Sequence, residues 1–492
     1  MKAFSKRTIS AALAALLAAT AAMTAACGST ESDDTTASAN TISPPEPNDP
    51  RNVSDDLPEM DFGRAAFTIL DREQYSYEFG VQEETGDLLN DTVYKRNITV
   101  EDRFGVDITT YTLPCSWGTE SDDFNATLRS SIMAGDGAFD LVAGYAATIP
   151  ALVSDGLFYD WNKLDYVDFS KPWWSELVAE ELTINGKMFL ATGDLSLALW
   201  QGMNCIYFNK VLGESYNVGD IYQTVIDGEW TLDRLIELTK DVYRDLDGDS
   251  KKSENDCFGL LLGNSIEIDS MKEAFEIHVT TKGDDGLPEI TFVNEHTIEV
   301  IQKINSFIHD NNDVFLPPVG TPFANSMAAF SEGRVLFFTS TLGVSEKLRA
   351  MDNDFGILPY PKYDENQESY HSTSHDEFSL FVIPVDVKDP EMTSIIAEAL
   401  CAESYKQVVP VYYDTALKTK AARDEDSSAM IDIIRDGLTF DFGYLHSSSI
   451  DYVGHLFVGL VRDNNNNIVS IYKSNESAYE TKLEKVLSIY TK

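Results

Sequence analysis

The chain alternates short apolar runs with longer stretches in which apolar residues recur every three or four positions. The short runs are rich in β-branched and aromatic residues and end at turn-forming residues, which is typical of strands. An Asn185–Gly186 pair between apolar residues predicts a hairpin turn. Six runs are predicted to be strands, at residues 65–70, 106–113, 139–144, 335–340, 355–361 and 378–384.

Three amphipathic stretches predict helices, each preceded by a polar side chain that can cap it. The expected caps are Asn90, Thr231 and Asp389, and Pro390 suits the first turn of the third helix. Strands that alternate with helices indicate an α/β architecture.

The first 27 residues have the pattern of a secretory signal: a basic start, an alanine-rich apolar stretch at 9–26, and small residues before a cut. Residues 24–27 resemble the lipobox of bacterial lipoproteins, although Thr24 stands where such boxes usually carry Leu. The resemblance implies that Cys27 is lipidated and holds the protein at a membrane outside the cytoplasm. A plain secretory signal with an incidental cysteine is the alternative.

Residues 28–60 contain few large apolar side chains and predict a disordered tether with a reach on the order of 30 Å. The globular body is expected to begin at residue 61. Roughly 430 residues then remain, which exceeds one compact core and suits two or three domains. No later stretch is apolar over the ~20 residues needed to span a bilayer.

Acidic residues outnumber basic ones by 81 to 37, giving a formal net charge of −44. Nucleic acid is therefore excluded as a partner, because phosphate binding needs clustered Lys and Arg. The excess acid is interpreted as a solubility feature. The four cysteines of the body form no metal-type cluster, so either two disulfides in one of three pairings or four buried thiols are expected. They are Cys115, Cys205, Cys257 and Cys401.

Five segments resemble, in order, segments of the family 1 extracellular solute-binding proteins. These are lipid-anchored receptors of ABC importers with a maltose-binding-protein-like fold. The resemblance runs from about residue 61 to the end and implies an α/β, two-lobed periplasmic-binding-protein-like fold of class II. It further implies a monomer whose lobes close by a hinge around a ligand, which is delivered to permease subunits. The matching segments are 85–108, 204–212, 228–242, 352–370 and 416–434.

By the same analogy, lobe one is expected to hold 61–203 and 334–376, and lobe two 204–333 and 377–492. Ligands of open α/β sheets bind beyond the carboxyl ends of strands. Aromatic rings can cover the apolar faces of a sugar while polar groups bond its hydroxyls. An oligosaccharide is therefore expected, chiefly from the family resemblance, and Trp230 is assigned to the core. The predicted ligand contacts are Tyr75, Trp117, Tyr145, Asp194, Trp200, Ser340 and Thr341.

An acidic loop at 245–256 has the spacing of a calcium-binding loop of the dockerin type. Its departures are Ser250 at position 6, where Gly is standard, and the short Asp at position 12. A structural calcium ion is expected, with an acidic solvated turn as the alternative. The predicted ligands are Asp245, Asp247, Asp249, the carbonyl of Lys251, Ser253 and Asp256.

No nucleophile elbow, zinc-protease motif or phosphate-binding loop occurs, so the chain is not expected to be an enzyme. Two alternatives to the receptor stay open. One is a secreted glycan-processing hydrolase on the same scaffold, and the other is a ligand sensor or adhesin without transport.

Overall fold

Two β-sheets organise the described part of the chain, which covers residues 52–263, 266–413 and 425–492 of this computed structural model. The first sheet has the order β11-β3-β1-β2. Its strand β1 is parallel to β2 and β3, and β11 is antiparallel to β3. The bounds are β1 Ala65–Arg72, β2 Val106–Leu113, β3 Leu141–Tyr145 and β11 Ser379–Val382.

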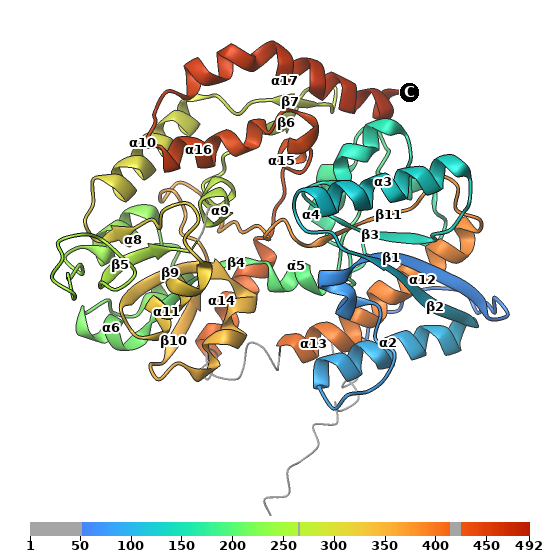
Figure 1. Ribbon diagram of the computed structural model, residues 1–492, viewed down its shortest axis with the longest axis horizontal. Helices are drawn as coiled ribbons and strands as arrows, with labels where there is room; N and C mark the ends of the chain where they lie inside the picture. The colour runs from blue at the N-terminus through green and yellow to red at the C-terminus, as the bar shows by residue number, and fades with distance from the viewer. Residues whose placement is uncertain (1–51, 264–265, 414–424) are drawn as a thin grey trace, which may run out of the picture. The chain divides into compact units, whose positions relative to one another are not determined.

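The second sheet has the order β10-β4-β9-β5-β8, with β4 antiparallel to both of its neighbours and β5 parallel to both of its own. A separate hairpin pairs β6 with β7. Figure 1 shows helix α5 (Leu197–Gln201) between the two sheets, next to strand β4 of the second one. The remaining bounds are β4 Asn204–Asn209, β5 Phe258–Leu262, β6 Thr280–Lys282, β7 Pro288–Ile290, β8 Val314–Phe315, β9 Val335–Thr341 and β10 Phe355–Leu358.

All six predicted strands are present, and the mixed α/β fold class is confirmed. The strand pairing, however, reverses part of the predicted lobe assignment. Strands β9 and β10, expected in lobe one, pair with β4 in the second sheet, and β11, expected in lobe two, joins the first sheet. The division was drawn by analogy with the family, whereas a strand belongs to the sheet that satisfies its backbone hydrogen bonds.

The two segments that connect the sheets run side by side. Asn204 N donates to Thr373 O at 2.9 Å, and His375 N donates to Gly202 O at 2.8 Å. The carbonyl of Met203 accepts from Leu342 N, just after β9. The chain thus passes from the first sheet to the second before β4 and returns before β11.

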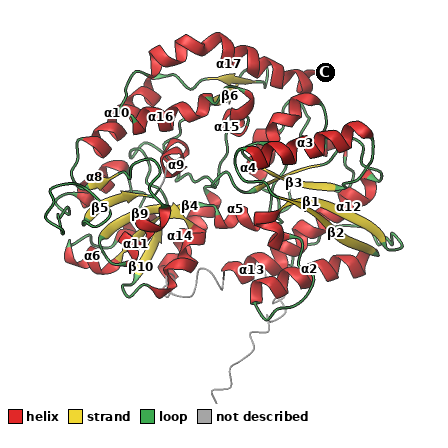
Figure 2. Cartoon of the chain, in the orientation of Figure 1, coloured by secondary structure: helices red, strands yellow, loops and turns green. Residues whose placement is uncertain are grey.

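Helices surround the strands of each sheet (Figure 2). The expected caps Thr231 and Asp389 are confirmed, since each accepts a hydrogen bond from its helix. The expected cap Asn90 is wrong, because Asp87 caps that helix and accepts from Asn90 N. The helices that matter below are α2 Leu88–Phe104, α3 Thr119–Ala134, α4 Glu176–Leu182, α9 Ile266–Ala274, α10 Glu295–His309 and α12 Pro390–Glu403. The C-terminal ones are α13 Val409–Tyr412, α14 Glu425–Asp436, α15 Phe442–Leu445, α16 Leu456–Arg462 and α17 Ile468–Thr491.

Several short helices complete the fold. The α-helices are α6 Lys210–Ser215, α7 Ile221–Ile226, α8 Leu232–Thr239 and α11 Phe323–Ser331. The 3-10 helices include η1 Glu73–Glu78, η2 Ile149–Asp155, η4 Leu342–Ala350, η7 Ser447–Ser449 and η8 Val453–His455. No described helix combines the length and apolar character needed to cross a bilayer.

The N-terminal boundary differs from the prediction within the described residues. The expected tether extended to residue 60, but Asp55 is buried and accepts from Arg103 Nη2 at 3.0 Å. Lys171 Nζ also donates to Asp56 at 2.6 Å, and Leu57 packs partly against the core. The body therefore includes residues 53–60, and Cys27 with most of the expected tether lies outside the described residues.

The cysteines of the body are free and buried. Cys115, Cys205, Cys257 and Cys401 form no disulfide with one another. Burial raises the pKa of the Cys115 thiol to about 12, so this thiol stays protonated at neutral pH. The alternative of four buried thiols, rather than two disulfides, matches this structure.

Candidate functional site

An aromatic cluster lies at the carboxyl ends of the parallel strands β1 and β3. Arg72 and Tyr145 are the last residues of these strands, and Tyr75 follows in η1. The Arg72 guanidinium carbon lies 4.3 Å from the Tyr75 ring centroid and 5.4 Å from that of Tyr145. Tyr75 Oη donates to Glu377 Oε2 at 2.6 Å. The strand ends therefore bring two predicted ligand residues together with a cation and a carboxylate.

Trp117 extends this cluster toward the C-terminal part of the chain. Its ring centroid lies 6.4 Å from Tyr145 and 6.3 Å from Tyr452. Trp117 is 57% exposed and Tyr452 is 43% exposed, so the two rings present apolar surface to solvent. Exposed apolar side chains that gather in one patch, unlike single ones, often mark a binding site.

Tyr452 is held in an unusual backbone conformation. Its φ is +56°, and that of Asp451 is +55°, both in the left-handed region that bulky residues rarely occupy. Tyr452 N donates to Ser447 O at 2.7 Å, and Asp451 forms an ion pair with Lys482 of α17. Backbone strain of this kind persists only where surrounding contacts impose it, and it gathers at functional sites.

The aromatic contacts continue from Tyr452 toward α9. His455 lies 5.5 Å from Tyr452 and stacks on Tyr444 at 5.3 Å, and Tyr444 Oη donates to Asp269 Oδ2 at 3.0 Å. We call the series Tyr145, Trp117, Tyr452, His455 and Tyr444 the aromatic row. The row begins at Tyr145, the end of strand β3 in the first sheet. It ends near α9 and α10, because α16, which follows His455, packs against these two helices.

Titratable groups lie beside the aromatic row. Burial raises the pKa of Asp269 to about 7. His375 lies 3.2 Å from Asp376; burial works against its protonation, but the hydrogen bond and charge of Asp376 leave its pKa raised. Of these groups and their neighbours, Glu377 is exposed, whereas Arg72 and Asp269 are buried.

Sequence reasoning missed Tyr452, His455 and Tyr444. They are far from Trp117 along the chain and do not follow a strand, so the strand-end rule could not select them. The Asp451–Tyr452 pair contains no glycine, and no local signal marks its left-handed backbone.

Asp194 and Trp200, two further predicted contacts, lie elsewhere. Trp200 Nε1 donates to Asp194 Oδ1 at 3.0 Å, and both residues line a cavity of about 300 Å³ with Trp174 and Arg435. Burial raises the pKa of Asp194 to about 8, although the Trp200 hydrogen bond and the Arg435 charge oppose the rise. This cavity has no lining residue in common with the aromatic row.

The last two predicted contacts, Ser340 and Thr341, end strand β9. Ser340 is buried, and Thr341 is half-buried with its carbonyl accepting from Tyr207 Oη at 2.8 Å. Trp230 is fully buried and donates to Pro359 O, so its assignment to the core is confirmed.

The predicted calcium loop gathers three carboxylates. Carboxylate oxygens of Asp245, Asp247 and Asp249 all lie within 4.8 Å of one another, and the three residues are exposed. Ser250 has a φ of +62°, the conformation for which a glycine is standard at this position of the loop. Asp256 instead is buried and accepts from the amides of Leu246 and Ser253, both at 3.0 Å.

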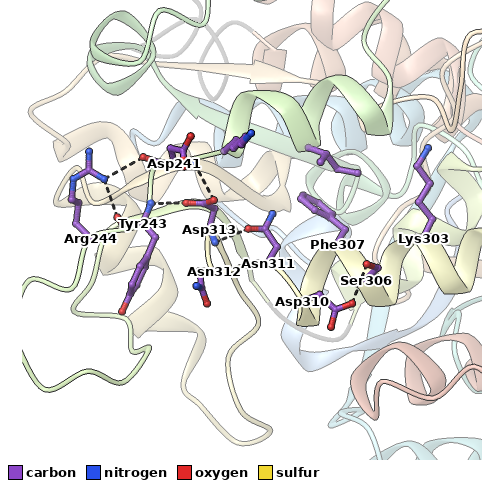
Figure 3. Close-up of a pocket in the computed structure, with 12 residues that line it drawn as sticks. Asp241, Tyr243, Arg244, Lys303, Ser306, Phe307, Asp310, Asn311, Asn312 and Asp313 are labelled. Carbon is purple, nitrogen blue, oxygen red and sulfur yellow. Dashed lines mark hydrogen bonds between the residues drawn. The ribbon is translucent and has the colours of Figure 1, made fainter.

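A larger cavity of about 920 Å³ lies between α8, α10 and the start of the acidic loop (Figure 3). Its wall is polar, but much of that polarity serves the fold. Asp313 accepts from the amides of Asp241 and Tyr243, and Ser306 donates to Asp310 at 3.0 Å. None of the predicted ligand contacts lines this cavity.

Comparison with solved structures shows a shared fold. A cyclo/maltodextrin-binding protein complexed with maltotetraose matches with a TM-score of 0.54 and 13% identity, over 87% of this chain and 97% of that one. An ABC substrate-binding protein of Listeria monocytogenes, in complex with cycloalternan, matches at 0.50 with 12% identity, over 86% and 98%. The GacH receptor of Streptomyces glaucescens, solved unliganded and with acarbose, also matches at 0.50 with 12% identity, over 87% and 99%.

No curated protein sequence matches the chain significantly. The family model described as bacterial extracellular solute-binding protein, in contrast, matches residues 108–426, well over half of the sequence. This match makes the chain a solute-binding protein rather than an enzyme and implies a location outside the cytoplasm. The chain belongs to the bacterial extracellular solute-binding protein family.

Proposed function

We propose that this protein captures a carbohydrate, an oligosaccharide in particular, at the aromatic row and delivers it to an ABC permease. The observation that carries the proposal is the exposed pair Trp117 and Tyr452, whose rings lie 6.3 Å apart. A sugar ring has apolar CH faces, and indole and phenol rings cover such faces well. The similar structures, which hold maltotetraose, cycloalternan and acarbose, support the same ligand class.

Polar groups beside the row would bond the hydroxyls of the sugar. The exposed carboxylate of Glu377 offers an acceptor, and buried Arg72 holds this segment in place by donating to Glu377 O. Asp376 is half-buried and lies next to the row. This mixture of apolar faces and few convergent polar groups is typical of pockets for small polar ligands.

The row also suggests how binding would drive closure. Trp117 follows β2 of the first sheet, whereas Tyr452 precedes α16, which packs on α9 and α10. A ligand that contacts both rings favours the conformation in which they approach each other. Closure would then create the surface that a permease recognises.

The N-terminus completes the proposal. Cys27 would carry a lipid that anchors the receptor to the membrane, and the residues after it would act as a tether. The receptor would work as a monomer. These features rest on the lipobox resemblance and on the family's role outside the cell.

Calorimetric titration with mono- and oligosaccharides, peptides and polyols tests the function. A Trp side chain has about 250 Å² of surface; if a sugar covers half of the exposed 57% of Trp117, about 70 Å² is buried. At about 25 cal/mol per Å², Trp117→Ala should cost about 2 kcal/mol, a ten- to thirtyfold weaker Kd. Tyr111→Ala, an aromatic 49% exposed on β2, is the matched control and should leave Kd unchanged.

Each outcome has a distinct meaning. Absence of binding to every saccharide refutes the ligand class. Saccharide binding that Trp117→Ala leaves intact refutes the aromatic row as the site. Recovery of shortened products from the titration cell would favour the glycan-processing alternative.

We also propose that the acidic loop holds a structural calcium ion. Support comes from the three converging carboxylates and from the left-handed backbone at Ser250. Calcium at a hundred times its Kd would stabilise the fold by about 2.7 kcal/mol. The melting temperature should therefore rise with added calcium and stay constant in Asp247→Ala, which removes one of the three converging carboxylates; an unchanged melting temperature in the wild type would refute the ion.

A further inference from the structure

The cavity beside helix α5 has the character of a binding site of its own. It has a volume of about 300 Å³ and lies between the first sheet's surroundings and the end of α14. We call it the α5 cavity. Its wall includes Trp174, Asp194, Leu199, Trp200, Met203 and Arg435. We propose that the α5 cavity binds one small neutral polyol, the size of a monosaccharide, independently of the aromatic row.

Helix α5 lies between the α5 cavity and a different cavity at the start of α2. Trp200 lines the α5 cavity, whereas the next residue, Gln201, accepts from Tyr77 Oη at 2.5 Å. Gln201 and Tyr77 line a different cavity at the start of α2, and the two cavities have no residue in common. No residue of the aromatic row lines the α5 cavity either, so a ligand in the α5 cavity would occupy a second site.

The chemistry of the wall favours a neutral ligand with an apolar face. Two indole rings and the side chains of Leu199 and Met203 supply apolar surface, which suits the CH face of a sugar ring. The cations are already paired: Arg435 lies 3.0 Å from Asp436, and Lys171 donates to Asp56. An anionic ligand would therefore find no uncompensated cation among these groups.

Asp194 gives the cavity an unmet hydrogen-bonding requirement. The residue is only 7% exposed, and its Oδ1 accepts from Trp200, but Oδ2 has no partner among the described residues. A ligand hydroxyl would supply the hydrogen-bond partner that this oxygen lacks. The Oδ2 atom is covered in this conformation, and a ligand hydroxyl would reach it after a small movement of the wall. Because burial raises its pKa to about 8, the carboxyl is largely neutral at pH 7 and can bond a hydroxyl as donor or acceptor.

The size of the cavity limits the ligand. A volume of about 300 Å³ stands at the lower end of the range for small-molecule pockets, about 300–1,000 Å³. One pyranose ring fits this space, and a chain of several rings does not. The proposed ligand is therefore smaller than the oligosaccharide proposed for the aromatic row.

Fluorine NMR of the protein labelled with 5-fluorotryptophan tests the proposal, because the chain contains only six tryptophans. Single Trp→Phe variants assign the signals, and glucose, galactose, xylose and glycerol serve as probes. We expect at least one probe to shift the Trp174 and Trp200 signals saturably. The shifts should persist in Trp117→Ala, which alters only the aromatic row.

Two variants should weaken the response at least tenfold. Asp194→Leu removes the polar group, and Leu438→Phe fills the cavity should Asp194→Leu fail to fold. The proposal is overturned if no probe shifts Trp174 and Trp200 up to about 100 mM, a limit beyond which binding is negligible. It is equally overturned if the shifts vanish in Trp117→Ala or survive unchanged in Leu438→Phe. A failed oligosaccharide response at Trp117 would bear on the proposed function alone, on which this second site does not depend.

Discussion

Glu398 of helix α12 lies in a buried hydrogen-bond group that one substitution can test. Trp173 Nε1 donates to its Oε1 at 2.9 Å, and Trp174 Nε1 donates to its Oε2 at 2.7 Å. Asp168 N donates to Oε2 as well, at 3.3 Å. Burial raises the pKa of this carboxyl from its ordinary 4.5 to about 7, even though the three donors oppose the rise.

The shift fixes the sign and size of a pH effect on stability. Between pH 4.5 and about 7 the folded state holds the Glu398 proton more firmly than the unfolded state does. Stability from this group is therefore greatest below pH 4.5, falls as the pH rises, and is fully lost above about 7. The difference between the two pKa values corresponds to about 3 kcal/mol in the free energy of unfolding.

Urea unfolding at pH 5 and pH 8 measures this effect. We compare the wild type with Glu398→Gln, because the amide does not titrate. The wild type should lose about 2.5 kcal/mol more between the two pH values than Glu398→Gln does, because at pH 5 the unfolded state has already lost most of this proton. Glu391→Gln, an exposed acid at the start of the same helix, is the matched control and should behave like the wild type.

The comparison between variants is needed because other buried acids act in the same direction. Burial also raises the pKa of Glu78 and of Glu267 to about 7. The absolute pH slope of the wild type is therefore a sum over several groups. Equal slopes for the wild type and Glu398→Gln would refute the account given for Glu398.

Three further predictions test separate features. Asp389→Ala removes the cap that accepts from Met392 N at 3.0 Å and should lower the free energy of unfolding by about 1 kcal/mol in urea. Tyr452→Gly relieves a left-handed residue at φ +56°, so the melting temperature should hold or rise while calorimetry shows weaker saccharide binding. A thiol reagent should leave Cys115, Cys205, Cys257 and Cys401 unmodified in the folded protein and react with all four after unfolding; fewer than four would indicate a disulfide.

The local elements of the fold could be predicted because their signals are local. Each of the six apolar runs is a strand, and Thr231 and Asp389 cap the helices expected to follow them. Asn90 failed as a cap because Asp87, three residues earlier, offers a carboxylate in the same geometry. Propensity alone does not rank two polar residues so close together.

Strand partnership could not be predicted in the same way. Strands β9 and β11 are both short and apolar, and nothing in either run states which sheet it joins. The partner of β9 is β4, far earlier in the chain, and this pairing is fixed only when the whole second sheet assembles. The predicted lobe boundaries failed at this long-range step, although the elements themselves were right.

The residues of the candidate site were also only partly predictable from local signals. The strand-end rule placed Tyr75 and Tyr145 together, because parallel strands carry their ends to one edge of a sheet. It could not supply Tyr452, whose position depends on a strained turn and on the Lys482 ion pair. Predictions from the local sequence fail most often at functional or strained sites.

Buried acids are a further feature that the local sequence does not predict. Several of them lie where the two sheets are connected. Glu78 accepts from Ala198 N of helix α5 and from Ser379 Oγ at the start of β11. Asp194 precedes the same helix, and Asp269 bonds Tyr444 at the end of the aromatic row. Burying carboxyls costs free energy, and a protein selected only for stability would place apolar residues there. Burial raises the pKa of all three carboxyls to about 7 or 8, so the protonation of each near neutral pH depends on how its surroundings bury it.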